Sequence, residues 1–227
     1  MTSLLADAVA PSGKPACRLQ QSNNWQRLAY RLARRGARLQ LAQVWEGDLN
    51  VIAEPRWDSK YEFRQLDAYD LCRLTAYPTN HLVYDTALRL ADANHRCFAA
   101  LDGPSLACYA WFAEHNIGPE DTMNIPLSLS ADACYLFNAF AAPAYRGRGL
   151  YVSTARRALA EMCRSGKSQG LALIEYGNVA SMRSHDRIGL RPQGWIVSLG
   201  RGGLSYRWYS SAARKCGFGD SRPHKIL

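Results

Sequence analysis

The sequence lacks the long hydrophobic runs that membrane insertion requires. Its longest uncharged apolar stretch, residues 133–145, is 13 residues long and contains Asn138, whereas a membrane-spanning helix needs about 20 apolar residues. The first residues include Asp7 and carry no basic segment ahead of an apolar one, which argues against a secretory signal. We therefore expect a cytoplasmic protein.

The sequence also lacks the cysteine spacings of disulfide-rich and zinc-binding domains. It has seven cysteines, none of which forms a Cys-x-x-Cys pair or lies beside clustered histidines. An odd and scattered set is typical of reduced thiols in a reducing compartment. The sequence therefore predicts neither a disulfide framework nor a metal site.

Acidic residues are nearly missing from the first 45 positions, which hold seven Lys or Arg and the single acid Asp7. Apolar and basic side chains alternate there with a helical period, namely Trp25, Leu28, Leu32 and Leu39 against Arg27, Arg31, Arg34 and Arg38. The sequence predicts a basic amphipathic extension over residues 1–38. Two interpretations stay open: it binds an anionic inner membrane face or an acidic carrier protein, or it packs on the domain. Nothing else in the chain supports base readout, so no specific nucleic acid is expected.

What is present is enough for one folded domain with an appendage, because the 227 residues are 48% hydrophobic and include six tryptophans. Apolar periodicity and turn residues predict helices over 66–77, 83–94, 150–164 and 178–188, and strands within 39–52 and over 97–101, 106–113, 134–141, 171–175, 195–199 and 204–210. This order is typical of a mixed α+β fold. We expect the domain over residues 39–211 and a loose polar tail over residues 212–227.

The turn before the helix over 150–164 carries the clearest chemical signal. It reads PAYRGRGLY at residues 143–151. Gly147 and Gly149 let a ligand approach the backbone closely, and the first turn of a helix offers unpaired N–H groups and a positive dipole end. Arg146 and Arg148 add two cations. The pattern predicts a diphosphate site; the alternative is a turn that needs glycine for its geometry alone.

This stretch resembles the acetyl-CoA-binding motif of the GCN5-related N-acetyltransferase (GNAT) superfamily, Arg/Gln-x-x-Gly-x-Gly/Ala at the start of a helix. Arg146 and Gly149 match the motif, whereas Tyr151 stands where the family usually has Gly or Ala. That tyrosine would either crowd the phosphates or point outward.

A second GNAT motif, Asn-x-x-Ala/Ser-x-x-x-Tyr-x-x-x-Gly, follows the next strand. Asn178, Ser181 and Gly189 lie in its register, with His185 in place of the usual Tyr. The resemblance covers roughly residues 39–210. It implies an α+β fold with a central mixed, mostly antiparallel sheet, a splayed parallel strand pair, and helices on both faces.

The resemblance also implies which residues would hold acetyl-CoA as co-substrate. The pantetheine arm would pair with the backbone of the strand end, and the diphosphate would bind main-chain N–H groups of the turn; the residues are Ala139, Phe140, Ala141, Arg146, Gly147, Arg148, Gly149, Leu150 and Tyr151. Asn178 would either reach the pantetheine or only cap its helix.

The resemblance also implies two catalytic roles. His185 would protonate the leaving thiolate, since an unperturbed histidine titrates near pH 6.5; the alternative is a surface histidine. Glu175, at the end of the strand over 171–175, is the first candidate for the base that takes a proton from the amine. The other candidates are Asp132 or a position near Tyr135, Glu114, His115, or a water chain.

Three functions are consistent with this sequence. The first is an acyl-CoA-dependent N-acyltransferase, most simply using acetyl-CoA, that acts on the amine of a small molecule such as an amino sugar. The second uses a longer acyl chain from an acidic acyl carrier protein docked on the basic extension. The third is a CoA-binding module without catalysis, for which the departures at Tyr151 and His185 would be evidence.

Overall fold

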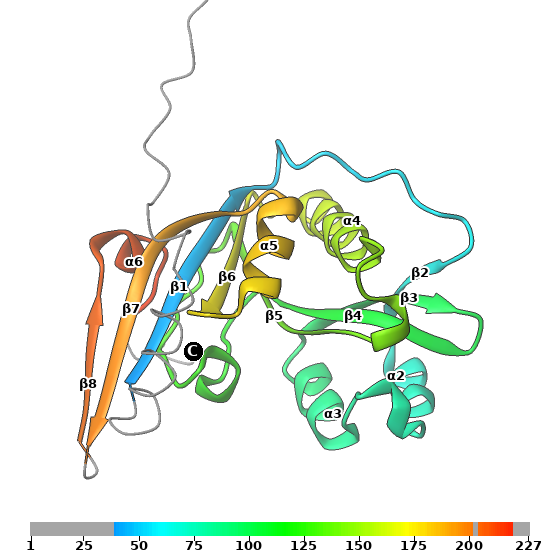
Figure 1. Cartoon of the computed structure of the whole chain (residues 1–227), viewed down its shortest axis with the longest axis horizontal. Coiled ribbons are helices and arrows are strands. Elements are labelled where there is room, and N and C mark those ends of the chain that lie inside the picture. The colour runs from blue at the N-terminus through cyan, green and yellow to red at the C-terminus, as the bar shows by residue number, and fades with distance from the viewer. Residues whose placement is uncertain (1–38, 202–203, 220–227) are drawn as a thin grey trace, which may run out of the picture.

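A computed structural model describes residues 39–201 and 204–219 (Figure 1). The predicted basic extension over residues 1–38 lies outside this part of the chain. No helix among the described residues is both long and apolar enough to cross a bilayer.

One mixed sheet of eight strands forms the centre of the molecule, in the order β2-β3-β4-β5-β6-β1-β7-β8. Its strands are β1 Leu39–Asp48, β2 Glu62–Leu66, β3 Arg96–Asp102, β4 Ser105–Ala113, β5 Ala133–Ala141, β6 Gln169–Glu175, β7 Arg191–Arg201 and β8 Leu204–Tyr209. Strands β5 and β6 pair in parallel; the other neighbours pair antiparallel. The predicted α+β sheet with one parallel pair is confirmed.

Helices cover both faces of the sheet (Figure 1). One face carries α2 Ala68–Thr75 and α3 Tyr84–Asp92, and the other carries α4 Leu150–Arg164 and α5 Val179–Ile188. Short 3-10 turns lie at η2 Pro78–Asn80, η3 Pro119–Thr122 and η4 Pro143–Tyr145, and α6 Ser211–Lys215 packs against β7.

Strand β4 explains the two-layered core. Its side chains alternate between the faces, as a strand requires. Trp111 packs into the cluster beneath α2 and α3, whereas Ala110 and Phe112 pack into the cluster beneath α4 and α5. Because both faces are covered, the strand is apolar along its length.

The segment 39–52 was consistent with one strand or a strand pair, and the structure has one strand, β1, that ends at Asp48. Two other local predictions were incomplete or wrong. The edge strand β2 was missed because it is short and polar on its exposed positions. The tail was predicted to be loose from residue 212, but Ala213 and Phe218 are fully buried, and the Phe218 ring packs edge-on to Tyr135. Burial of these apolar side chains fixes the chain as far as residue 219, and residues 220–227 lie outside the described part.

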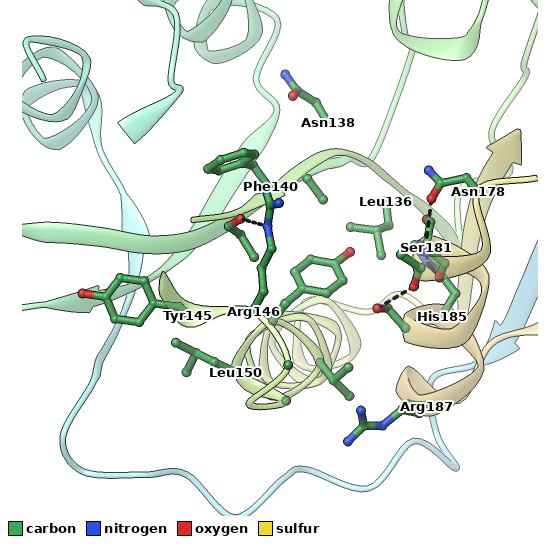
Figure 2. A pocket seen from close by; sticks show the side chains of 18 of the residues that line it. Leu136, Asn138, Phe140, Tyr145, Arg146, Leu150, Asn178, Ser181, His185 and Arg187 are labelled. Carbon is green, nitrogen blue, oxygen red and sulfur yellow. Dashed lines mark hydrogen bonds between the residues drawn. The ribbon is translucent and has the colours of Figure 1, made fainter. Parts of the chain in front are cut away.

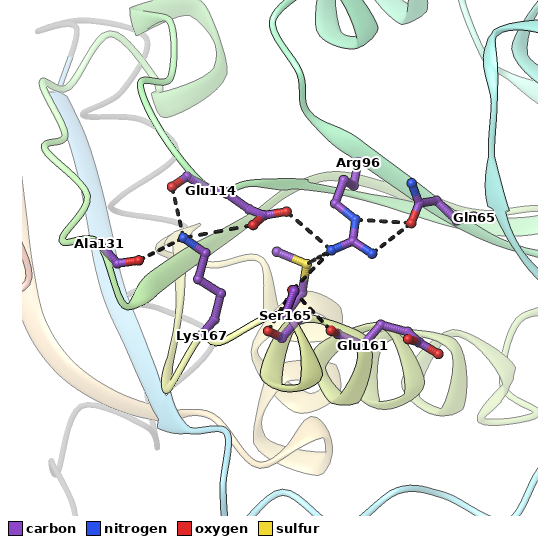
Figure 3. Close-up of polar contacts among 8 residues, drawn as sticks. Gln65, Arg96, Glu114, Ala131, Glu161, Ser165 and Lys167 are labelled. Carbon is purple, nitrogen blue, oxygen red and sulfur yellow. Dashed lines mark hydrogen bonds and ion pairs between the residues drawn. The ribbon is translucent and has the colours of Figure 1, made fainter.

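A polar cluster joins the sheet to the end of α4 (Figure 3). The nearly buried Lys167 Nζ donates to the carbonyl of Ala131 at 2.8 Å and lies 3.9 Å from Glu114 Oε2. Arg96 Nη1 lies 3.3 Å from Glu114 Oε1 and 3.2 Å from the Ser165 hydroxyl. The cluster therefore holds Glu114, the residue after β4, beside the N-terminal end of β5.

Candidate functional site

The parallel strands β5 and β6 separate halfway along their length. They pair only from Ala133–Gln169 to Leu136–Ala172 within the described chain. Beyond Leu136, β5 continues to pair with β4 through a register shift, and Asn138 there has a φ of 40°, in the left-handed region. Such a bulge bends a strand and increases its twist, so it turns β5 away from β6.

A cavity of about 540 Å³ opens where the strands part (Figure 2). Its walls include Leu136, Val152 and His185 on the α4–α5 side and Phe137, Phe140 and Leu173 on the α2–α3 side. Because side chains from both faces of the sheet line it, the cavity is a slot that passes between the strands. Its size falls within the range of small-molecule sites, roughly 300–1,000 Å³.

The turn from β5 to α4 forms one end of the slot. Gly147 and Gly149 both have a φ of 76°, a conformation that glycine adopts without strain. Gly149 is the N-cap of α4 and has no side chain that could accept hydrogen bonds from the first N–H groups of the helix. The first intrahelical bond joins Ser153 N to Gly149 O; the N–H groups before it are therefore available to an anion.

The arginines of the turn have different surroundings. Arg146 Nε donates to the carbonyl of Ala141 at 2.9 Å, and its guanidinium lies over the Phe140 ring (Figure 2). Arg146 therefore fixes the end of β5 against the turn. Arg148 is exposed and does not line the cavity.

Arg187 of α5 is a cation that the sequence reading missed. It lines the slot, and its Nη2 lies 3.5 Å from the position that a Cβ of Gly149 would take. The helical spacing of Ala180, Ser184 and Arg187, all of which line the slot, was the available signal. Arg187 therefore adds positive charge beside the N-terminus of α4.

Tyr151 does not point outward, and so one of the two predicted orientations is excluded. Its ring packs against both the cluster around Leu159 and the cluster around Leu150, and it lines the slot. Its hydroxyl is buried and has no hydrogen-bond partner among the described residues. Burial raises the pKa of this phenol above its ordinary value.

Asn178, Ser181 and His185 lie on one face of α5 and line the slot (Figure 2). Asn178 Oδ1 accepts from Ser181 N at 3.2 Å, so the residue caps the helix and also faces the cavity. His185 Nδ1 lies 2.8 Å from Ser181 O. A carbonyl only accepts, so Nδ1 carries the proton and Nε2 does not.

The acid role predicted for His185 conflicts with this environment. The side chain is buried, and desolvation lowers its pKa to about 4. At neutral pH the ring is uncharged and has no spare proton for a leaving group. The prediction failed because the spacing of the motif locates the residue but says nothing of its burial.

This lowered pKa predicts a pH-dependent stability. Between pH 6.5 and about 4 the unfolded chain binds a proton on His185 that the folded chain does not. The free energy of unfolding therefore has its full value, as far as His185 is concerned, above pH 6.5, and it decreases as the pH falls toward 4. We expect wild type to lose roughly 3 kcal/mol more than His185→Gln over that range. Urea unfolding of both proteins at pH 7.5 and 4 measures the difference; parallel losses would contradict the burial of a neutral ring.

None of the predicted base candidates lines the slot. Glu175 lies at the end of β6, two residues beyond Leu173 on the same face of the strand. Glu114 is held in the polar cluster, and His115 is exposed. The remaining candidates belong to the paired part of the sheet: Tyr135 is buried there, and Asp132 accepts from the Ser168 hydroxyl.

No group of three or more His, Cys, Asp or Glu is placed to hold a metal within the described residues.

No protein-family model matches the sequence, and a sequence search of curated proteins gives no match. Solved structures do share the fold. One is the GCN5-related glucosamine N-acetyltransferase region of a fungal multi-domain GH3 β-N-acetylglucosaminidase, with 14% identity and a TM-score of 0.52 over 82% of this chain and 23% of that chain. A GNAT-family acetyltransferase from Colwellia psychrerythraea has 11% identity and a TM-score of 0.52 over 76% of this chain and 61% of that chain.

A third similar structure is a GCN5-related N-acetyltransferase from Kribbella flavida, with 14% identity and a TM-score of 0.50 over 78% of this chain and 64% of that chain. The chain therefore spans less than two thirds of each of these three structures. At such low identity the similarity establishes the architecture of the chain, whereas the activity has to be argued from the site.

Proposed function

From the premise that this chain has the fold of the GCN5-related N-acetyltransferases, we propose that it is an acyl-CoA-dependent N-acyltransferase. The donor is most simply acetyl-CoA, and the acceptor is the amine of a small molecule. The observation that carries the proposal is the slot between β5 and β6, which begins at the uncapped N-terminus of α4 and passes through the sheet.

The donor enters from the side of α4 in this proposal. Its diphosphate accepts hydrogen bonds from the first N–H groups of α4, with Arg187 and Arg148 supplying charge. The pantetheine arm extends along β5, where the small residues Ala139 and Ala141 leave room for it. The Ala141 carbonyl already accepts from Arg146, so Ala139 and Phe140 offer the backbone groups for pairing.

The amine reaches the thioester from the opposite face, because α4 and α5 cover the donor side. There the ring of the exposed His81 lies 4.6 Å from that of Phe140, which lines the slot. A neutral amine attacks the thioester carbonyl carbon directly, and backbone N–H groups at the strand edge stabilise the oxyanion. Glu175 remains our candidate base and acts through water, since it lies outside the cavity wall.

The acceptor class is proposed by analogy with one structure of the same fold. An amino sugar is the first candidate, because one structure of this fold is a glucosamine N-acetyltransferase region. The alternative donor, an acyl carrier protein with a longer chain, is favoured only by the basic residues of the first 45 positions.

Calorimetric titration of the full chain with acetyl-CoA and with a long-chain acyl-CoA tests the donor. We expect micromolar binding of acetyl-CoA, followed by release of free thiol when amines are added, amino sugars first. Binding of the long-chain donor alone would favour the carrier-protein alternative. Binding of acetyl-CoA without thiol release from any amine class would favour a non-catalytic module and contradict the proposal.

A further inference from the structure

The hydroxyl of Tyr151 is an exception among the polar groups at the slot, because it is buried without a hydrogen-bond partner among the described residues. Buried tyrosine hydroxyls usually find a partner, and a buried donor without one destabilises the fold. A group that is kept at such a cost, at the wall of a cavity, is explained when a ligand in the cavity completes its hydrogen bond.

The surroundings of Tyr151 hold this hydroxyl in place and leave it protonated. Its ring is packed between two core clusters, which limits its rotation. The nearby thiol of Cys108 is already hydrogen-bonded to Thr154 Oγ1, at 3.3 Å. Burial raises the pKa of the phenol, so the hydroxyl is neutral at physiological pH and gives up its proton only to a base that is desolvated in the same site.

The other side chains that could give up a proton at the slot are engaged. His185 Nδ1–H donates a hydrogen bond to Ser181 O. The Tyr145 hydroxyl donates to Asp102 Oδ2 at 3.1 Å, and the Ser184 hydroxyl donates to Ala180 O at 2.9 Å. Arginines hold their protons too tightly to act as acids. The Ser181 hydroxyl lies 3.3 Å from His185 Nδ1, and an aliphatic alcohol is a much weaker acid than a phenol. Tyr151 is therefore the phenol of the described cavity wall whose proton is available.

We propose that Tyr151 is the catalytic residue that gives its phenolic proton to the sulfur of the leaving thiolate. The assignment rests on the proposed function. As the amine nitrogen bonds to the carbonyl carbon, the C–S bond breaks and sulfur keeps the electron pair and takes the phenolic proton. The cationic nitrogen loses its proton to water or to a carboxylate, and solvent returns a proton to the phenolate. One proton has then moved from nitrogen to sulfur overall.

The test compares Tyr151→Phe with wild type, and Tyr206→Phe, an exposed tyrosine on β8, serves as the matched control. We expect Tyr151→Phe to lower kcat with acetyl-CoA by about tenfold to a hundredfold, less than the largest effects of general acids because a thiolate leaves readily. The Kd for acetyl-CoA should stay within about twofold. The apo protein should unfold at the same or a higher temperature, because an unpartnered buried hydroxyl is gone.

The leaving group separates an acid from a structural role. With acetyl-pantetheine as donor, we expect Tyr151→Phe to lower kcat/KM relative to wild type. The fold-decrease should equal the fold-decrease in kcat that the same variant shows with acetyl-CoA. With S-phenyl thioacetate, whose aromatic thiol is more acidic and needs less help to leave, the two proteins should react nearly alike. Equal losses with both donors would overturn the proposal, as would an unchanged kcat in an active wild-type background. Wild type that releases no thiol from any donor would overturn the proposed function itself.

Discussion

Gly147→Asp combined with Arg148→Glu is expected to weaken acetyl-CoA binding about a thousandfold while the fold survives. The two changes alter the charge by three units at the turn into α4, where we propose that the diphosphate binds. No atom lies within 4 Å of a Cβ built at Gly147, and Arg148 is exposed. Charge of this size several ångströms from a diphosphate is worth about 4 kcal/mol between the dielectric limits of water and protein, which corresponds to about a thousandfold.

The neutral pair Gly147→Asn with Arg148→Gln is the control for this variant. It has nearly the same shape, and Asn and Asp both tolerate the positive φ of residue 147 better than other side chains. We expect the neutral variant to bind acetyl-CoA within about tenfold of wild type. Calorimetry and thermal unfolding of both variants separate charge from folding. An equal loss in both would show that backbone geometry decides, and full affinity in the charged variant would remove the turn from the donor site.

Ala139→Trp is expected to close the slot and to reduce acetyl-CoA affinity about a hundredfold or more. Ala139 follows the left-handed Asn138, is exposed, and lines the cavity. An indole ring there would occupy the space between β5 and β6 that the pantetheine arm requires. The diphosphate region is separate, so adenosine 3′,5′-bisphosphate should bind as it does to wild type.

Ala139→Ser provides the size control and should bind both ligands normally. The charged turn variant should lose both acetyl-CoA and the bisphosphate, whereas Ala139→Trp should lose only acetyl-CoA. If Ala139→Trp kept its affinity for acetyl-CoA, the acyl arm would lie elsewhere. If it lost both ligands while still folded, the slot and the turn would not be separable parts of the site.

Local sequence was informative where consecutive residues decide the outcome. The turn at Gly147 and Gly149 was predicted from two glycines between an apolar strand and a helix, and both adopt positive φ in the structure. A helix cap was one of the two roles expected for Asn178, and the cap is present. Hydrophobic periodicity located α4 and α5 because each has one buried face.

Residues that depend on distant neighbours were predicted less well. The position of His185 on the slot was correct, but its charge depends on burial against elements such as the strand that carries Trp45. Glu175 ends the expected strand yet misses the cavity wall. Phe218 is buried against Tyr135, a residue far away in the sequence. Local sequence patterns do not predict such a contact.

The sequence by itself therefore determined the α+β class of the fold, the glycine turn before α4 and the helix faces that border it, because backbone preference and short periodicities are local properties. Only the tertiary structure decided that β5 leaves β6 after Leu136, that Arg187 reaches Gly149, and that Tyr151 rather than His185 has a proton to spare. Strand separation, charge state and hydrogen-bond availability depend on which residues exclude water around a group, and that is settled only when the chain has packed.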